Sequence, residues 1–398
     1  MISSVSESVC PEKRLLVRCA RTQLPAGFGQ EIRELAAQPL DWDFLFADAA
    51  QNSLRPLLTR HLSACAAEIV PPEQLKRLSD AVRANTARCL ILTAELIQLM
   101  DRFRDAGISA VPYKGPVAAG QAYEDITLRE FEDLDIIVRQ RDMPRVNEVV
   151  TSLGYGPKFP WIRSLDAGSA LVPGEYQYFD RSRRMVVEVH TERTLRHFPI
   201  PPDLDDLSRR LVPVVLGGHE IRTFAPEDAL VMLCIHGSKD FWERISWIAD
   251  IAELIRACPR LDWDAVYSRA DSWRARRILH LGLALAAEML DARLPDGIEA
   301  RVKQDRAATA LASEVAQRLL GRDQSAFGSA GRFSFRRRTV DGALSGWRYA
   351  IRLAVAPAEE DWQMVRLPRL LAPLYVALRP LRLLRKYGWS GGGSDGSA

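Results

Sequence analysis

The hydrophobic pattern of the sequence changes at Gly107 and changes back at Pro226. Before Gly107, apolar residues recur at the three- and four-residue spacing of amphipathic helices. Between the two positions lie short runs rich in β-branched residues, which are typical of strands. After Pro226 the helical spacing returns. The pattern therefore predicts an α+β protein, in which a small mixed α/β domain lies between helical regions.

The same changes of pattern divide the 398 residues into five expected parts. They are a helical N-terminal region (1–107), the α/β domain (108–225), a helical domain (226–320), a basic C-terminal segment (321–389) and a disordered Gly/Ser-rich tail (390–398). No apolar stretch approaches the roughly 20 residues of a membrane span, and the N-terminus lacks the apolar core of a signal peptide. Six scattered cysteines without a C-x-x-C pair indicate reduced thiols, so we expect a cytoplasmic protein.

Two carboxylates mark the start of an expected strand at 134–138. Asp133 and Asp135 lie two residues apart, and residues at this spacing on a strand point to the same face. Glu188 lies between two valines on another expected strand, 185–190, and a buried acid is unfavourable unless it is paired or binds a metal. Carboxylate oxygens are the ligands that Mg²⁺ prefers. The three acids therefore predict a metal site.

A bare D-x-D pattern has little specificity, because this chain contains three more. Each of the other three lies at an expected helix start, where Asp caps the helix: Asp41-Trp-Asp43, Asp203-Leu-Asp205 and Asp262-Trp-Asp264. Two expected hairpins, 176–190 and 212–224, complete the α/β domain.

Several motifs together resemble the bacterial family of uncharacterised nucleotidyltransferases, in the DNA polymerase β-like superfamily. They are Val-Pro-Tyr-Lys114-Gly115, then Arg129 and Phe-Glu-Asp133-Leu-Asp135-Ile-Ile-Val, then Val-Glu188-Val-His190, with His236, Lys239 and Asp250 in the helical part that follows. The resemblance runs from about Asp41 to Ile255. It implies a nucleotidyltransferase-like fold for the α/β domain.

The resemblance also implies a reaction and roles for these residues. Asp133, Asp135 and Glu188 would bind two Mg²⁺ ions, and a nucleoside monophosphate would pass from an NTP, expected to be ATP, to an unidentified acceptor. Glu188 would also take the acceptor's proton. Lys114, Gly115 and Arg129 would bind the nucleotide. The superfamily's usual Gly-Ser or Gly-Gly is Lys114-Gly115-Pro116 here, and Pro116 has no amide hydrogen for a phosphate.

The sequence is compatible with more than one role for several of these residues. Arg129 could instead form a surface ion pair with Glu130 or Glu132. His190 lies on the strand face of Glu188 and is a candidate for the acceptor side or for support of the metal ligands, as are His236, Lys239 and Asp250. The alternative is a structural polar cluster in which Asp250 pairs with His236 or Lys239. A catalytically silent binding or scaffold protein in cell-surface polysaccharide or peptide biosynthesis is the alternative function.

The basic C-terminal segment carries the strongest charge bias. Residues 332–386 contain twelve basic and four acidic side chains, a net charge of +8, whereas the whole chain has +3. Between Arg366 and Lys386, Leu and Arg alternate at roughly helical spacing, with Tyr375 and Trp389 near the ends. This pattern suggests peripheral attachment to an anionic membrane at the inner face, with packing on the helical domain as the alternative. No nucleic-acid-binding signature accompanies the charge, so specific nucleic-acid recognition is not expected.

Overall fold

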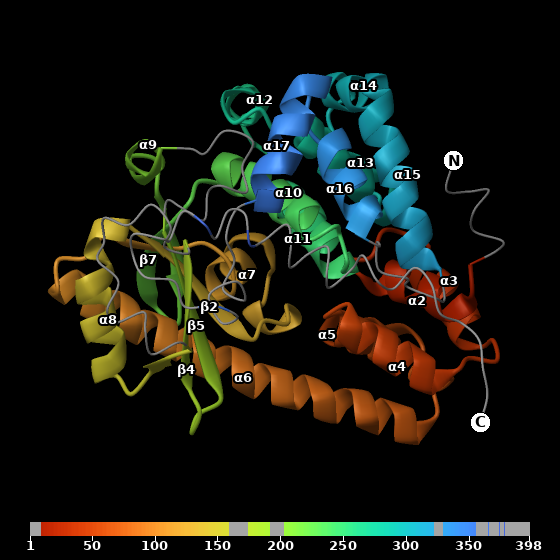
Figure 1. Cartoon of the computed structure of the whole chain (residues 1–398). Coiled ribbons are helices and arrows are strands. Elements are labelled where there is room, and N and C mark those ends of the chain that lie inside the picture. Colours follow the sequence, from red (N-terminus) through yellow and green to blue (C-terminus); the bar gives the residue numbers. More distant parts are fainter. Residues whose placement is uncertain are drawn as a thin grey trace, which may run out of the picture.

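The computed structural model describes residues 9–158, 174–191, 203–321 and 329–355, together with positions 365, 374 and 378. Helices surround a five-stranded mixed sheet, which confirms the expected α+β class. The sheet lies beside α8 at one end of the molecule, and the later helices pack together at the other (Figure 1). No described helix is long and apolar enough to span a bilayer, and all six cysteines are free thiols.

The N-terminal region is helical, as its spacing predicts. Its helices are α2 (Pro11–Cys19), α3 (Phe28–Ala36), α4 (Trp42–Gln51), α5 (Arg55–Cys65) and α6 (Pro72–Asp105). The long helix α6 buries Leu92, Leu96, Leu99 and Phe103, which recur every three or four residues along one face. This face packs under the sheet, so α6 joins the N-terminal helices to the α/β domain (Figure 1).

The sheet has the strand order β1-β2-β5-β4-β3. Its strands are β1 (Ala110–Pro112), β2 (Asp133–Val138), β3 (Gly156–Pro157), β4 (Glu175–Asp180) and β5 (Met185–Thr191). The central pair, β2 and β5, is parallel, and every other pairing is antiparallel. The β4–β5 hairpin and a separate hairpin of β6 (Val212–Leu216) and β7 (His219–Thr223) confirm both expected hairpins.

The two faces of the sheet differ in chemistry. Leu134 and Ile136 of β2 and Val187 and Val189 of β5 lie in an apolar core with α6 and α8 (Met143–Ser152). The residues that alternate with them face the other way. This second face carries the acids of β2 and β5 and lies toward the later helices.

The C-terminal half is again helical. Its elements are α10 (Pro226–Lys239), α11 (Ile245–Ala257), α12 (Trp263–Ser272), α13 (Arg276–Leu290), α14 (Asp296–Gln304), α15 (Arg306–Leu320), α16 (Ser329–Arg338) and α17 (Ala343–Val355). Short connecting helices are α7 (Pro116–Ala122), α9 (Leu204–Ser208), η1 (Ile126–Leu128) and η2 (Gln140–Asp142). The expected amphipathic run from Arg366 to Lys386 lies outside the described residues, apart from Leu374 and Leu378.

Gly237 allows α10 to pack closely against the segment that follows it. A Cβ atom at Gly237 would lie 2.5–2.6 Å from three ring atoms of Trp242, whose side chain is fully buried. We expect Gly237→Ala to lower the free energy of unfolding by about 1–3 kcal/mol, because the buried ring has no room to move. Urea denaturation followed by circular dichroism measures this change.

Gly297→Ala is the matched control for this prediction. Gly297 is also helical, but nothing lies within 4 Å of the position of its Cβ. We expect this variant to be as stable as the wild type or more stable by up to about 1 kcal/mol. Equal destabilisation of both variants would show that α10 does not pack tightly at Gly237.

Candidate functional site

The strand register places the acids of β2 and β5 on one face. In the parallel pair, Asp135 lies opposite Glu188, and Asp133 and His190 extend the same face in either direction. Their neighbours along each strand, such as Leu134 and Val187, point into the apolar core. The convergence expected for Asp133, Asp135 and Glu188 on one sheet face is therefore present.

Asp135 is at the centre of the site. Its Oδ1 accepts a hydrogen bond from Lys114 Nζ at 2.9 Å and contacts His190 Nε2 at 2.8 Å. Its side chain is only 4% exposed. Burial alone would raise the pKa of Asp135, but the positive charge of Lys114 and the bond to His190 outweigh burial and hold this pKa well below its usual range. Asp135 is therefore an ionised carboxylate inside the protein.

Glu188 has no such lysine contact among the residues that the structure describes. Gln177 Nε2 donates to its Oε1 at 2.6 Å, and His190 Nε2 lies 3.7 Å from its Oε2. Burial, followed by the negative charge of Asp135, raises the pKa of Glu188 to about 8. The same two causes raise the pKa of Asp133 to about 6. Among the residues that the structure describes, this face therefore brings like charges close together.

Within the described residues, Asp135, Glu188 and His190 form a group that could hold a metal ion. One potential ligand atom from each lies within 4.8 Å of the others. The group includes His190 besides two of the predicted ligands, and Asp133, the third predicted ligand, lies on the same face two residues before Asp135. Two carboxylates and an imidazole suit a divalent cation such as Mg²⁺ or Mn²⁺, with carboxylates the better ligands for Mg²⁺.

The turn after β1 brings Lys114 to the acids. Gly115 has a φ of +55°, a backbone conformation that residues with a Cβ rarely adopt, and its Cβ would lie 3.2 Å from the carbonyl oxygen of Asp133. Pro116 is the first residue of α7, a position at which a backbone amide hydrogen would have no hydrogen-bond partner within the helix. Gly115 thus allows a close approach of the turn to β2, and Lys114 reaches Asp135 from it.

The structure corrects the expectations for Arg129 and Asp250. Arg129 does not form a surface ion pair with Glu130 or Glu132. Its Nε and Nη2 donate to both carboxylate oxygens of Asp250, at 2.8 and 2.9 Å; Asp250 is buried, and the Arg129 side chain is only 12% exposed. Asp250 also accepts from the Tyr123 hydroxyl at 2.8 Å, so neither His236 nor Lys239 is its partner. The sequence could not show this pairing because α11 and the loop before β2 meet only in the folded chain.

His236 and Lys239 lie on α10, which faces the polar side of the sheet. Burial, together with the positive charges of Lys114 and Lys239, holds the pKa of His236 well below its usual range. His236 packs edge-on against Trp247, with ring centroids 5.0 Å apart, and its Nδ1 lies 3.4 Å from a carboxylate oxygen of Asp240. Lys239 acts electrostatically on Glu175 and His236, which places its charge near the site.

Sequence reasoning missed two residues of the site, Glu175 and Gln177. Glu175 pairs with His190 across the β4–β5 hairpin, and its Oε2 lies 4.0 Å from His190 Nδ1. Gln177 pairs with Glu188 and donates to it. Strand alternation along the expected hairpin carries the signal for both, because a residue directly across from a site residue shares its face.

The other three D-x-D sequences are helix caps, as predicted. In each case the side chain of the first Asp accepts a hydrogen bond from a backbone N–H at the start of its helix: Asp41 from Phe44, Asp203 from Asp205 and Asp262 from Ala265. Strand context therefore separates the D-x-D of the site from the caps.

Comparison with known proteins gives one family and one structural neighbour. Residues 38–291 match the family described as "Uncharacterised nucleotidyltransferase". The crystal structure of an antigenic nucleotidyltransferase-like protein from Paracoccidioides brasiliensis shares 13% identity with the chain, covers 52% of it and 94% of its own length, and has a TM-score of 0.35. No curated relative matches the chain.

The Arg129–Asp250 pair gives a stability prediction. We expect Asp250→Ala to lower the free energy of unfolding by about 3–5 kcal/mol, because Arg129 would stay buried without its carboxylate. Differential scanning calorimetry measures the shift. The control is Asp80→Ala, which removes an exposed carboxylate paired with Lys76 and should leave the melting temperature nearly unchanged. An unchanged melting temperature for Asp250→Ala would mean that the pair does not stabilise the fold.

Proposed function

Because the chain belongs to the family of uncharacterised nucleotidyltransferases, we propose that it transfers a nucleoside monophosphate from a nucleoside triphosphate, ATP in our proposal, to an acceptor hydroxyl. The observation that carries the proposal is the position of Asp135, Glu188 and His190, whose ligand atoms converge on the polar face of the sheet beside Asp133. This proposal also follows the resemblance to the DNA polymerase β-like superfamily.

The donor set of the site fits divalent cations, and we propose two Mg²⁺ ions. Asp133, Asp135 and Glu188 would hold them, with His190 oriented by its contact to Asp135. When bound, the ions supply positive charge that neutralises the phosphates and lowers the pKa of the acceptor hydroxyl. The grouping of Asp133, Asp135 and Glu188 on one face supports this proposal, since burial and the charge of Asp135 raise the pKa of Glu188.

We assign phosphate binding to lysines rather than to Arg129. Both carboxylate oxygens of Asp250 hold Arg129, so we propose that it positions the loop that leads into β2. Lys114 pairs with the carboxylate of Asp135, and it lies on the turn that Gly115 allows to approach β2 closely. We propose that Lys114 transfers its contact from Asp135 to a phosphate oxygen, with Lys239 adding charge from α10.

The proposed transfer forms a bond between the acceptor oxygen and the α-phosphorus and breaks the bond from that phosphorus to the bridging oxygen. Pyrophosphate leaves with the electron pair of the broken bond. Glu188 accepts the proton of the acceptor hydroxyl. An ionised carboxylate beside the acceptor hydroxyl is suited to this role.

A catalytically silent scaffold is the second candidate. The observation in its favour is the 2.9 Å contact between Lys114 and Asp135, because an ammonium group already lies where a metal ion would bind Asp135. A protein that keeps this ion pair in the presence of nucleotide would bind partners through the same fold without turnover. Metal and nucleotide titrations separate the two candidates.

Our first test follows nucleotide transfer directly. Purified full-length protein is incubated with each NTP labelled at the α-phosphate and Mg²⁺, with small-molecule and protein acceptors, and labelled product and pyrophosphate are measured. We expect Asp135→Asn to lower turnover about 100-fold or more while the fold is kept. Asp264→Asn, the same change in the D-x-D at the start of α12, is the control and should retain activity. Turnover by Asp135→Asn at the wild-type rate would move the metal site elsewhere.

The second test uses the raised pKa of Glu188. Below about pH 8 the metal-free site keeps a proton on Glu188, and a metal ion must displace it. We therefore expect Mn²⁺ or Mg²⁺ to bind more tightly as the pH rises from 6 to 8, by up to about tenfold per pH unit, with release of about one proton. Isothermal titration calorimetry in buffers of different ionisation enthalpy measures both quantities.

Glu188→Gln is the variant that checks the source of this pH dependence. The amide keeps the shape of the side chain and cannot bind the proton. The metal affinity that remains in this variant should therefore change less between pH 6 and 8 than that of the wild type. The substitution should also raise the melting temperature of the metal-free protein at pH 8, where a buried charged carboxylate is removed. If the variant has the pH profile of the wild type, Glu188 is not a ligand.

A further inference from the structure

Helix α17 has apolar side chains on two opposite faces. Its inner face packs against α16, and Tyr349 and Ala350 are buried. Its outer face carries Leu344, Trp347 and Ile351, which are 75%, 46% and 50% exposed. These three residues recur at spacings of three and four and so lie side by side along the helix. A surface helix normally has a polar outer face, so this one needs an explanation.

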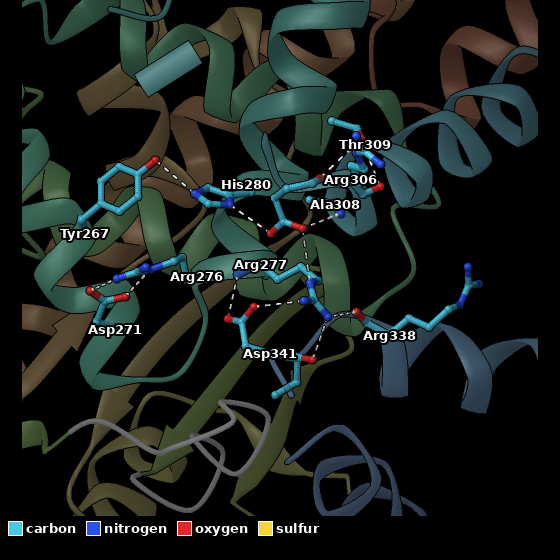
Figure 2. Close-up of polar contacts among 12 residues, drawn as sticks. Tyr267, Asp271, Arg276, Arg277, His280, Arg306, Ala308, Thr309, Arg338 and Asp341 are labelled. Carbon is cyan, nitrogen blue, oxygen red and sulfur yellow. Dashed lines mark hydrogen bonds and ion pairs between the residues drawn. The ribbon is translucent and has the colours of Figure 1, made fainter. Parts of the chain in front are cut away.

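Arg277 of α13 holds the hairpin of α16 and α17 in this orientation (Figure 2). Its Nη1 donates to the carbonyl oxygens of Arg338 and Val340, at 3.2 and 3.1 Å, and its Nη2 lies 3.4 Å from Asp341 Oδ1. Its Nε lies 3.5 Å from Asp305, which also binds His280. Because these contacts fix the turn between the two helices, the apolar outer face of α17 stays turned away from the body.

Positive charge borders this apolar face. The Arg337 guanidinium lies over the Trp347 ring, 5.2 Å from its centroid, and Arg348 is exposed on the same side of α17 as Leu344 and Ile351. Between residues 329 and 355 there are six arginines, and Asp341 is the single acidic residue. Arg277 holds Asp341, so its carboxylate is already partnered within the clamp.

We propose that the outer face of α17, made of Leu344, Trp347 and Ile351 with Arg337 and Arg348, is a peripheral binding surface for an anionic phospholipid bilayer. The apolar stripe would lie at the boundary between headgroups and acyl chains, with Trp347 at the headgroup level and the arginines on lipid phosphates. A nucleic acid would match the arginines and leave the exposed Leu344 and Ile351 without a partner. An anionic bilayer matches both the charge and the apolar surface.

Co-sedimentation of the full-length protein with vesicles tests this surface. We expect binding to vesicles of phosphatidylcholine with phosphatidylglycerol, weaker binding as salt rises, and little binding to phosphatidylcholine alone. Replacing Leu344 and Ile351 by Glu should remove binding to the level of neutral vesicles. Replacing Arg337 or Arg348 by Gln should lower the partition coefficient about fivefold for each arginine.

The matched control places the same change on another helix. Leu90 and Ile91 of α6 are 56% and 54% exposed, so replacing both by Glu removes similar apolar surface and adds the same charge away from α17. This variant should bind vesicles nearly as well as the wild type, and circular dichroism should show both double variants folded. Three results would each overturn the proposal: vesicle binding by the α17 variant equal to that of its α6 control, no binding of the wild type at low salt, or a wild-type dimer in light scattering that the α17 variant converts to a monomer.

Discussion

The parallel pairing of β2 with β5 determines where Asp133, Asp135 and Glu188 lie. Asp135 is opposite Glu188 in this register, and side chains alternate between the two faces along each strand. A slip of one residue would turn the carboxylates into the apolar core and expose Leu134 and Val187. The packing of those apolar residues on α6 and α8 opposes such a slip. The hydrophobic face of the sheet therefore fixes the geometry of the polar face.

Grouping these acids inside the protein is unfavourable, and the structure compensates for it unevenly. Lys114 and His190 stabilise the charge of Asp135, whereas in the described part of the chain the close donor to Glu188 is the neutral amide of Gln177, and the pKa of Glu188 stays raised. A structural ion-pair network would neutralise its members, because an unpaired buried charge lowers stability. The uneven compensation of these acids agrees with our proposal that the site takes a cation.

The sequence predicts those parts of the site that depend on local pattern. Strand alternation places Asp133, Asp135 and Glu188 on one face, and helix-start context identifies the D-x-D sequences that are caps. Alternation could also have identified Glu175 and Gln177. The partner of Asp250 could not be predicted, because 121 residues separate it from Arg129 and their contact depends on how α11 packs. The contact between His190 and Asp135 could not be predicted either, because it depends on the directions of the two side chains, which sequence spacing alone does not give.

The contacts of Asp250 show that the helical half belongs to the site. Asp250 lies on α11 and binds Tyr123, which follows α7, and Arg129, which precedes β2. The turn with Lys114 leads into α7, which ends just before Tyr123, and β2 begins with Asp133 four residues after Arg129. The carboxylate of Asp250 therefore holds both of the chain segments that carry site residues. Helix α11 also packs directly on α7. A sheet domain without α11 would lose this support, and the family match accordingly includes both the sheet and the helices that follow it.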